Sequence, residues 1–131
     1  MHLREVTNHN LLAWSTMIEF ESRMLDGTDT LVLSLHGRLD NESSEYLLDC
    51  IQGHIEDGAN NFILDCGELQ YMSSVGLGTL VRANSRLKRA EGKVLLASVE
   101  GVVAEVLRIS HLDRIFNIYP DVETAAAELQ A

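Results

Sequence analysis

Proline, cysteine and long apolar runs are scarce in this sequence of 131 residues, which contains one proline and two cysteines. Cys50 and Cys66 fall inside apolar segments without the spacing of metal ligands, and this favours two reduced, buried thiols. No apolar run approaches the length that crosses a bilayer, so membrane insertion is not expected. The first residues also lack the apolar core and the cleavage pattern of a secretory signal. The sequence therefore predicts a cytoplasmic protein.

Positive charge is also in short supply, because 10 Lys and Arg residues stand against 20 Asp and Glu residues, a formal net charge of -10. Phosphate backbones and anionic membrane surfaces repel such a chain, so direct contact with nucleic acid or with a membrane surface is not expected. The acidic surface is compatible with a basic face on a protein partner. Apolar residues, by contrast, make up 46% of the sequence, which is enough to fill the core of one domain of this length.

Apolar periodicity separates a weakly patterned extension, residues 1–17, from a domain over residues 18–131. In the extension, Leu11, Leu12 and Trp14 are compatible with a short helix and with an arm docked on the domain. Regular patterning begins at residue 18, so we treat the extension as an appendage to the domain.

Within the domain, strand-like and helix-like segments follow one another. An alternating apolar pattern on both sides of the turn sequence DGTD predicts a hairpin. Later strands are short, nearly all-apolar runs of the kind buried on both faces of a sheet. In chain order, we expect strands over 18–25 and 30–39, a helix within 40–58, a strand over 61–66, a helix that ends near residue 90, a strand over 92–99, a helix over 100–112, a strand over 114–119 and a helix over 120–130.

The order of these elements determines the expected fold class. A strand–helix–strand alternation that follows a hairpin implies parallel pairing with right-handed crossovers. We therefore expect a single α/β domain, with a mixed, mostly parallel β-sheet and about four helices packed on it.

The segment Tyr71–Gly78, YMSSVGLG, lies where a strand-like run passes into a helix-like run. Ser73 or Ser74 can cap the helix by accepting a hydrogen bond from a backbone N–H group. Capping does not account for Gly76 and Gly78, because each glycine inside a helix costs about 1 kcal/mol relative to alanine. Three explanations remain open: a neighbouring element packed against the helix start, a docking partner, or a phosphate.

Other chemistries fit this turn poorly. A nucleophile elbow, Gly-x-Ser-x-Gly, would place Ser74 before Gly76, but it requires glycine where the chain has Met72. A dinucleotide fingerprint would use Gly76 and Gly78, but its third glycine is replaced by Val81. The sequence therefore predicts no enzymatic activity and no cofactor. It also predicts no metal site, since no pair has ligand spacing among the five histidines, His2, His9, His36, His54 and His111.

A serine hydroxyl on an exposed turn at a helix N-terminus is a suitable phosphate acceptor. The free N–H groups and the helix dipole stabilise an anion at that position. Phosphorylation adds about -1.5 to -2 charges. A partner that docks on the helix would then meet a strongly solvated anion, so the serine turn is a candidate switch.

Four segments of the chain carry a family pattern. Residues 72–78 correspond to a motif in which a bulky apolar residue, after a buried strand, precedes Asp-Ser-Ser/Thr-Gly-Leu-Gly. Residues 35–47, LHGRLDNESSEYL, correspond to a Gly-x-Leu-Asp loop before the first helix. Residues 92–99 and 103–129 correspond to later strands and helices of the same family. With these segments in order, residues 18–130 resemble the STAS domain of bacterial anti-sigma factor antagonists.

The resemblance implies a phosphorylation site at Ser74, two residues before Gly76, with Ser73 as the second candidate. The chain departs from the family at two positions, because Ser73 replaces the aspartate before the phosphoserine and Val75 replaces the small hydroxyl residue after it. Asp40 is a candidate helix cap as well as a candidate contact, and both roles are compatible. The implied partner-binding residues are Asp40, Asn41, Ser73, Ser74, Val75, Gly76 and Gly78.

The function implied by the resemblance is partner switching. The unphosphorylated protein would bind an anti-sigma factor that is also a serine-protein kinase, and the client of that kinase would be released. The kinase would phosphorylate Ser74 with ATP and Mg²⁺, binding would be lost, and a serine phosphatase of the metal-dependent type would reset the protein. The alternative is a STAS binding module that is not phosphorylated and serves as a regulatory subunit of a transporter or a stress-signalling complex. A monomer and a weak dimer both remain open.

Overall fold

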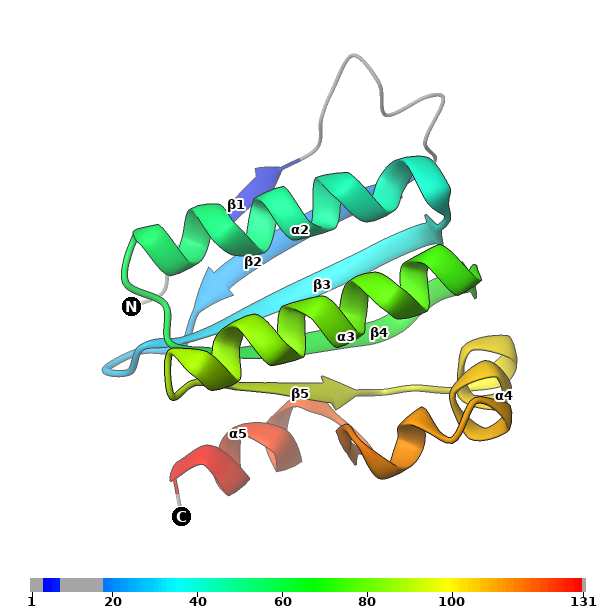
Figure 1. Ribbon diagram of the computed structural model, residues 1–131. Coiled ribbons are helices and arrows are strands. Elements are labelled where there is room, and N and C mark those ends of the chain that lie inside the picture. Colours follow the sequence, from blue (N-terminus) through cyan, green and yellow to red (C-terminus); the bar gives the residue numbers. More distant parts are fainter. Residues whose placement is uncertain (1–3, 8–17, 131) are drawn as a thin grey trace.

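A six-stranded sheet organises the part of the chain that the computed structural model describes, residues 4–7 and 18–130 (Figure 1). Each element begins near a turn or capping residue that the sequence provides. In chain order the elements are β1 (Arg4–Thr7), β2 (Ile18–Met24), β3 (Thr30–Leu39), α2 (Asn41–Glu56), β4 (Asn61–Met72), α3 (Ser74–Arg89), β5 (Lys93–Ala97), α4 (Gly101–Ile109), the 3₁₀ helix η2 (Leu112–Arg114), β6 (Asn117–Tyr119) and α5 (Val122–Gln130).

The order of strands in the sheet follows the chain, from β1 at one edge to β6 at the other. The pairs β1–β2 and β2–β3 are antiparallel, whereas β3–β4, β4–β5 and β5–β6 are parallel. A helical crossover precedes each parallel strand, as the strand–helix alternation requires. The expected α/β fold, with a mixed, mostly parallel sheet and four α-helices in the described part of the chain, is therefore confirmed.

Helices α2, α3 and α4 pack on one face of the sheet, and α5 covers part of the other (Figure 1). Leu47 and Ile51 of α2 and Leu80 and Leu87 of α3 are at most 1% exposed in the larger core. Because these apolar side chains recur at helical spacing, each helix is held along its whole length against the sheet. The smaller core beneath α5 contains Val32, Ile63, Leu95, Ala97 and Ala125.

Two strands differ from the expectation drawn from the sequence. β4 does not end at Cys66 but continues to Met72, paired with β3 across two register shifts. The shifts reset which side chains face the core, so the apolar pattern after Cys66 no longer looks like one strand. β6 is shorter than the expected 114–119, because Leu112–Arg114 forms a 3₁₀ turn and only Asn117–Tyr119 pairs with β5.

The N-terminal extension contributes an edge strand to the sheet. Arg4–Thr7 pairs antiparallel with β2, in register from Arg4 opposite Arg23 to Thr7 opposite Phe20. The short helix or docked arm expected around Leu11, Leu12 and Trp14 lies outside the described residues. The division of the chain between residues 17 and 18 stays a prediction.

Both cysteines are free thiols, as expected. Cys66 is buried, and burial raises the pKa of its thiol to about 12, so it remains protonated at neutral pH. Cys50 is only half-buried, because it lies at the edge of the apolar face of α2, and this corrects the expectation of two buried thiols. No helix in residues 4–7 and 18–130 is long and apolar enough to span a bilayer.

The buried face of α3 generates a stability prediction. Leu80 is 1% exposed and belongs to the larger core, so Leu80→Ala should lower the free energy of unfolding by about 2–5 kcal/mol. The control is Val102→Ala, because Val102 is 56% exposed and its truncation should cost about 0.5 kcal/mol or less. Chemical denaturation of both variants measures the two values, and similar values would show that the core face of α3 is wrongly assigned.

Candidate functional site

The expected site residues lie where β3 and β4 end and α2 and α3 begin. Because these strands are parallel neighbours, their carboxyl ends meet at the same edge of the sheet, which is where open α/β sheets place their binding sites. Figure 1 shows the N-termini of α2 and α3 side by side at this edge. The structure therefore brings the loop at Asp40 and the loop at Ser73 together, although 32 positions separate Asn41 from Ser73.

Asp40 is the N-cap of α2. Its Oδ1 atom accepts hydrogen bonds from the backbone N–H groups of Glu42 and Ser43, both at 3.1 Å. In return, the Ser43 hydroxyl oxygen accepts the backbone N–H of Asp40 at 2.8 Å, which completes a capping box. The capping role expected for Asp40 is confirmed, and the half-buried carboxylate is held in place beside the start of α3.

Ser73 is the N-cap of α3. Its hydroxyl oxygen accepts the backbone N–H of Gly76 at 3.1 Å, with an extended backbone at φ -87° and ψ 173°. The same hydroxyl donates to Oδ1 of Asn41, the first residue of α2, at 3.4 Å. The Ser73 side chain is therefore used to start α3 and to join it to α2.

Ser74, by contrast, is the first residue of α3 and is exposed. Its hydroxyl has no hydrogen-bond partner among the residues that the structure describes. The first turn of α3 contains no acidic residue. A phosphate on Ser74 would thus stand at the positive end of the helix dipole without a like charge in that turn.

Glycine occupies the two positions of the turn for different physical reasons. A Cβ atom on Gly76 would stand 2.8 Å from the carbonyl oxygen of Leu39, and Gly76 is buried. The packing explanation therefore holds for Gly76, which cannot present a surface to a partner. A Cβ atom on Gly78 would meet nothing within 4 Å, and Gly78 is exposed, so internal packing does not explain it. The docking explanation remains for Gly78 alone.

Around Ser74, the exposed surface is partly apolar. Val75, the residue after Ser74, is a large apolar side chain and is 41% exposed. Together with Gly78, these residues present a hydroxyl, an apolar side chain and a position without a side chain. Such a surface suits the close approach of a protein partner, and a single added charge on Ser74 would change it strongly.

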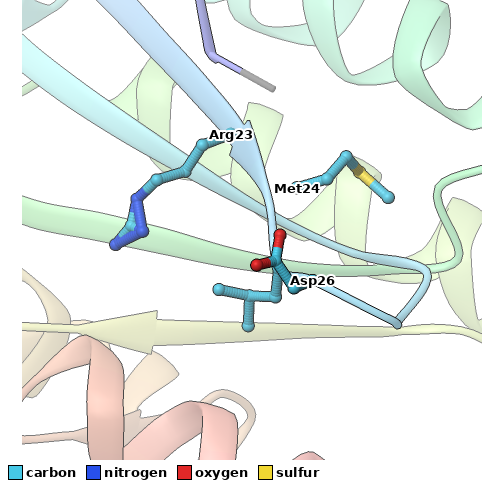
Figure 2. A pocket seen from close by; sticks show the side chains of 4 residues that line it. Arg23, Met24 and Asp26 are labelled. Carbon is cyan, nitrogen blue, oxygen red and sulfur yellow. The ribbon is translucent and has the colours of Figure 1, made fainter. Parts of the chain in front are cut away.

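No metal-ligating cluster accompanies the site in the described part of the chain. No group of three or more His, Cys, Asp or Glu side chains in that part of the chain could hold a metal ion. A hollow lined by Arg23, Met24, Leu25 and Asp26 lies at the hairpin between β2 and β3, where β3 begins rather than ends (Figure 2). The hollow therefore lies at the opposite end of β3 from Ser74.

Two contacts at the site were not anticipated from the sequence. The carbonyl oxygen of Leu39 accepts the backbone N–H of Ser73 at 2.9 Å, and Leu39 also faces Gly76. The hydrogen bond between Ser73 and Asn41 links the two helix starts. Both contacts join residues far apart in sequence, so no local pattern could have indicated them.

The different surroundings of the two serines lead to a prediction for stability. Ser73→Ala removes the cap of α3 and should cost about 1 kcal/mol. Ser74→Ala removes a hydroxyl without a partner and should change the free energy of unfolding by less than about 0.5 kcal/mol. Urea denaturation of the two variants compares them directly. Equal losses would contradict the assignment of Ser73 as the cap.

The two glycines provide a second, paired prediction. Gly78→Ala should raise the free energy of unfolding by up to about 1 kcal/mol, because alanine is the better helix former and its Cβ fits without contact. Gly76→Ala should lower it by about 1–3 kcal/mol, because the new Cβ meets the backbone at Leu39. Thermal or chemical unfolding shows the signs, and a destabilised Gly78→Ala would mean that Gly78 serves the fold.

Comparison with known proteins agrees with the fold. Residues 20–125 match the family model of the STAS domain. BtrV of Bordetella bronchiseptica, named as an anti-sigma factor antagonist, is 30% identical over 97 residues, which are 74% of this chain and 84% of BtrV.

Solved structures show the same architecture. TM1081 of Thermotoga maritima, described as an anti-sigma factor antagonist, has a TM-score of 0.79 at 24% identity, covering 86% of this chain and 95% of TM1081. The anti-sigma factor antagonist SpoIIAA, a cell fate determinant of Bacillus, has in its unphosphorylated form a TM-score of 0.73 at 24% identity, covering 85% of this chain and 96% of SpoIIAA. The chain belongs to the STAS domain family, and it has relatives that are named as anti-sigma factor antagonists.

Proposed function

We propose that the chain is a cytoplasmic anti-sigma factor antagonist that works by partner switching, with Ser74 as the phosphorylated residue. The observation that carries the proposal is the exposed hydroxyl of Ser74 on the first turn of α3, beside a glycine that the fold does not require. In the unphosphorylated state, the surface of Ser74, Val75 and Gly78 binds an anti-sigma factor that is also a serine-protein kinase. Binding displaces the client of that kinase.

The choice of Ser74 over Ser73 follows from their hydrogen bonds. A kinase must reach a hydroxyl that can enter its active site, and the Ser73 hydroxyl is held by Gly76 and Asn41. Phosphorylation of Ser73 would also require the cap of α3 to be given up or rebuilt. Ser74 can accept a phosphate while α3 remains capped, so the modified protein keeps its fold and loses only its binding surface.

The phosphate acts through charge and solvation. It adds about -1.5 to -2 charges to a surface that was neutral in its first turn. A partner that contacts Val75 would have to desolvate this anion, and no basic group of the chain is placed in the first turn of α3 to pair with it. The helix dipole stabilises the phosphate on the free protein. The phosphorylated protein is therefore stable on its own, whereas its binding to the partner is unfavourable.

The loop at Asp40 and Asn41 forms the neighbouring half of the docking surface. Asn41 is exposed and lies within hydrogen-bond reach of Ser73, so a partner over Ser74 also covers the start of α2. Asp40 serves mainly to fix this loop, since both of its cap bonds go to α2. In this scheme the chain is a substrate and a ligand rather than a catalyst, and a metal-dependent serine phosphatase removes the phosphate.

The relatives support the proposal. BtrV carries the name of an anti-sigma factor antagonist. SpoIIAA, with the same fold, has been described in an unphosphorylated and in a phosphorylated form. The serine pair of this chain differs from the family pattern at Ser73, and the hydrogen bonds of Ser73 show that serine provides the cap that an aspartate would provide.

Ser74→Ala should abolish phosphorylation by the kinase that acts on the wild type and should keep partner binding. That kinase is purified from the native host by following transfer of the γ-phosphate of ATP to the chain, and mass spectrometry maps the phosphate. Ser74→Asp should weaken binding by about 2–5 kcal/mol, because it places an unpaired charge on the docking surface.

The matched control is Ser73→Asp, which removes the neighbouring hydroxyl and keeps a good cap. It should still be phosphorylated on Ser74. A phosphate mapped to Ser73 in the wild type would contradict the site assignment. Equal affinity of the kinase for phosphorylated and unphosphorylated protein would contradict the switch and leave a STAS module that binds constitutively.

A further inference from the structure

Helix α3 carries a charge opposite to that of the chain. Its sequence contains Arg82, Arg86, Lys88 and Arg89, four of the 10 basic residues, although the net charge of the chain is -10. No acidic residue occurs between Glu68 and Glu91. The exposed face of α3 is therefore locally basic from Arg82 to Arg89.

The basic residues continue the exposed surface that begins at Ser74. At about 100° per residue, the buried positions of α3 lie on one side and the exposed positions on the other. From Ser74 to Arg89 this face is about 22 Å long, at about 1.5 Å per residue. Along it lie Ser74, Val75, Gly78, Arg82, Ser85, Lys88 and Arg89, all of them exposed.

Most of these basic side chains form no strong ion pair within the described part of the chain. Arg82 stands 3.7 Å from Glu45 of α2, but the two side chains are 53% and 69% exposed, and such a pair contributes less than about 1 kcal/mol. Arg86 donates to Oε1 of Gln52 at 3.1 Å, so it serves the contact between α2 and α3. Lys88 and Arg89 are exposed and have no carboxylate partner in the described part of the chain.

The helix dipole explains part of this pattern, but not all of it. Cations in the last turn are stabilised by the dipole, which accounts for Lys88 and Arg89. The dipole equally favours acidic residues in the first turn, and α2 and α5 have Glu42 and Glu123 there. The first turn of α3 has none, and Arg82 lies in the middle of the helix. The dipole therefore accounts for neither the lack of an acidic residue in the first turn nor Arg82.

We propose that Arg82, Lys88 and Arg89, the basic face of α3, bind an acidic surface on the same kinase that docks at Ser74. This inference rests on the proposed function and adds the charge of the partner to it. Opposite charges along the last ~10 Å of α3, from Arg82 to Arg89, would orient the kinase on this helix and raise the rate of association. They would also offset the repulsion between an acidic partner surface and a chain of net charge -10.

The test uses the kinase purified by its action on the chain. Lys88→Glu/Arg89→Glu should lower the affinity of the kinase for the unphosphorylated chain at least ~10-fold, mostly through slower association, and should weaken the dependence of affinity on salt. The affinity of the kinase for Lys88→Gln/Arg89→Gln should lie between its affinities for this variant and for the wild type. The matched control is Lys93→Glu/Arg114→Glu, which makes the same charge change at exposed positions outside α3 and should alter affinity less than ~2-fold.

The outcomes separate the inference from the proposed function. One outcome is that the kinase phosphorylates Ser74 and yet binds Lys88→Glu/Arg89→Glu as tightly as the control Lys93→Glu/Arg114→Glu. In that case the basic face of α3 is not part of the interface. If no kinase acts on Ser74, the proposed function and this inference fail together. The basic face of α3 could instead bind α2 of a second copy of the chain. Sedimentation of the chain alone tests for this self-association. Self-association that only Lys88→Glu/Arg89→Glu abolishes, with kinase affinity unchanged, would overturn the inference.

Discussion

The contact between the end of β3 and the start of α3 holds the candidate site together. The carbonyl oxygen of Leu39 accepts the backbone N–H of Ser73, and it stands where any side chain on Gly76 would have to go. This close approach places the first turn of α3 directly beside the loop that starts α2. The hydrogen bond between Asn41 and Ser73 joins the two helix starts at the same place.

The two adjacent serines have different surroundings. Ser73 satisfies an N–H group of the first turn and joins two helices, whereas Ser74 makes no hydrogen bond with its hydroxyl in the described part of the chain. A modification on Ser74 therefore changes the surface without removing an interaction that the fold needs. The same separation applies to the glycines, since Gly76 serves packing and Gly78 lies open on the surface. In this way the site can change its charge while the domain remains folded.

Charge is distributed so that the whole chain and the exposed face of α3 from Arg82 to Arg89 have opposite signs. The net charge of -10 resists contact with phosphate backbones, yet α3 contributes four basic residues and no acidic one. Composition alone describes the average and conceals this local reversal. Whether a basic residue faces the core, a neighbouring helix or solvent depends on its position around the helix axis. Arg86 is drawn toward Gln52 of α2, while Lys88 and Arg89 remain exposed.

The sequence alone determined the α/β class, the four helices, the hairpin and the location of the serine turn, because these follow from local periodicity, turn residues and capping residues. It left open which serine caps α3, why each glycine is present and where β4 ends. Only the tertiary structure decided these points, because each depends on an atom distant in sequence: Leu39 for Gly76, Asn41 for Ser73, and the register of β3 for the end of β4. The local sequence pattern specifies each helix or strand. The contacts between elements decide which role a residue at the end of a helix or strand has.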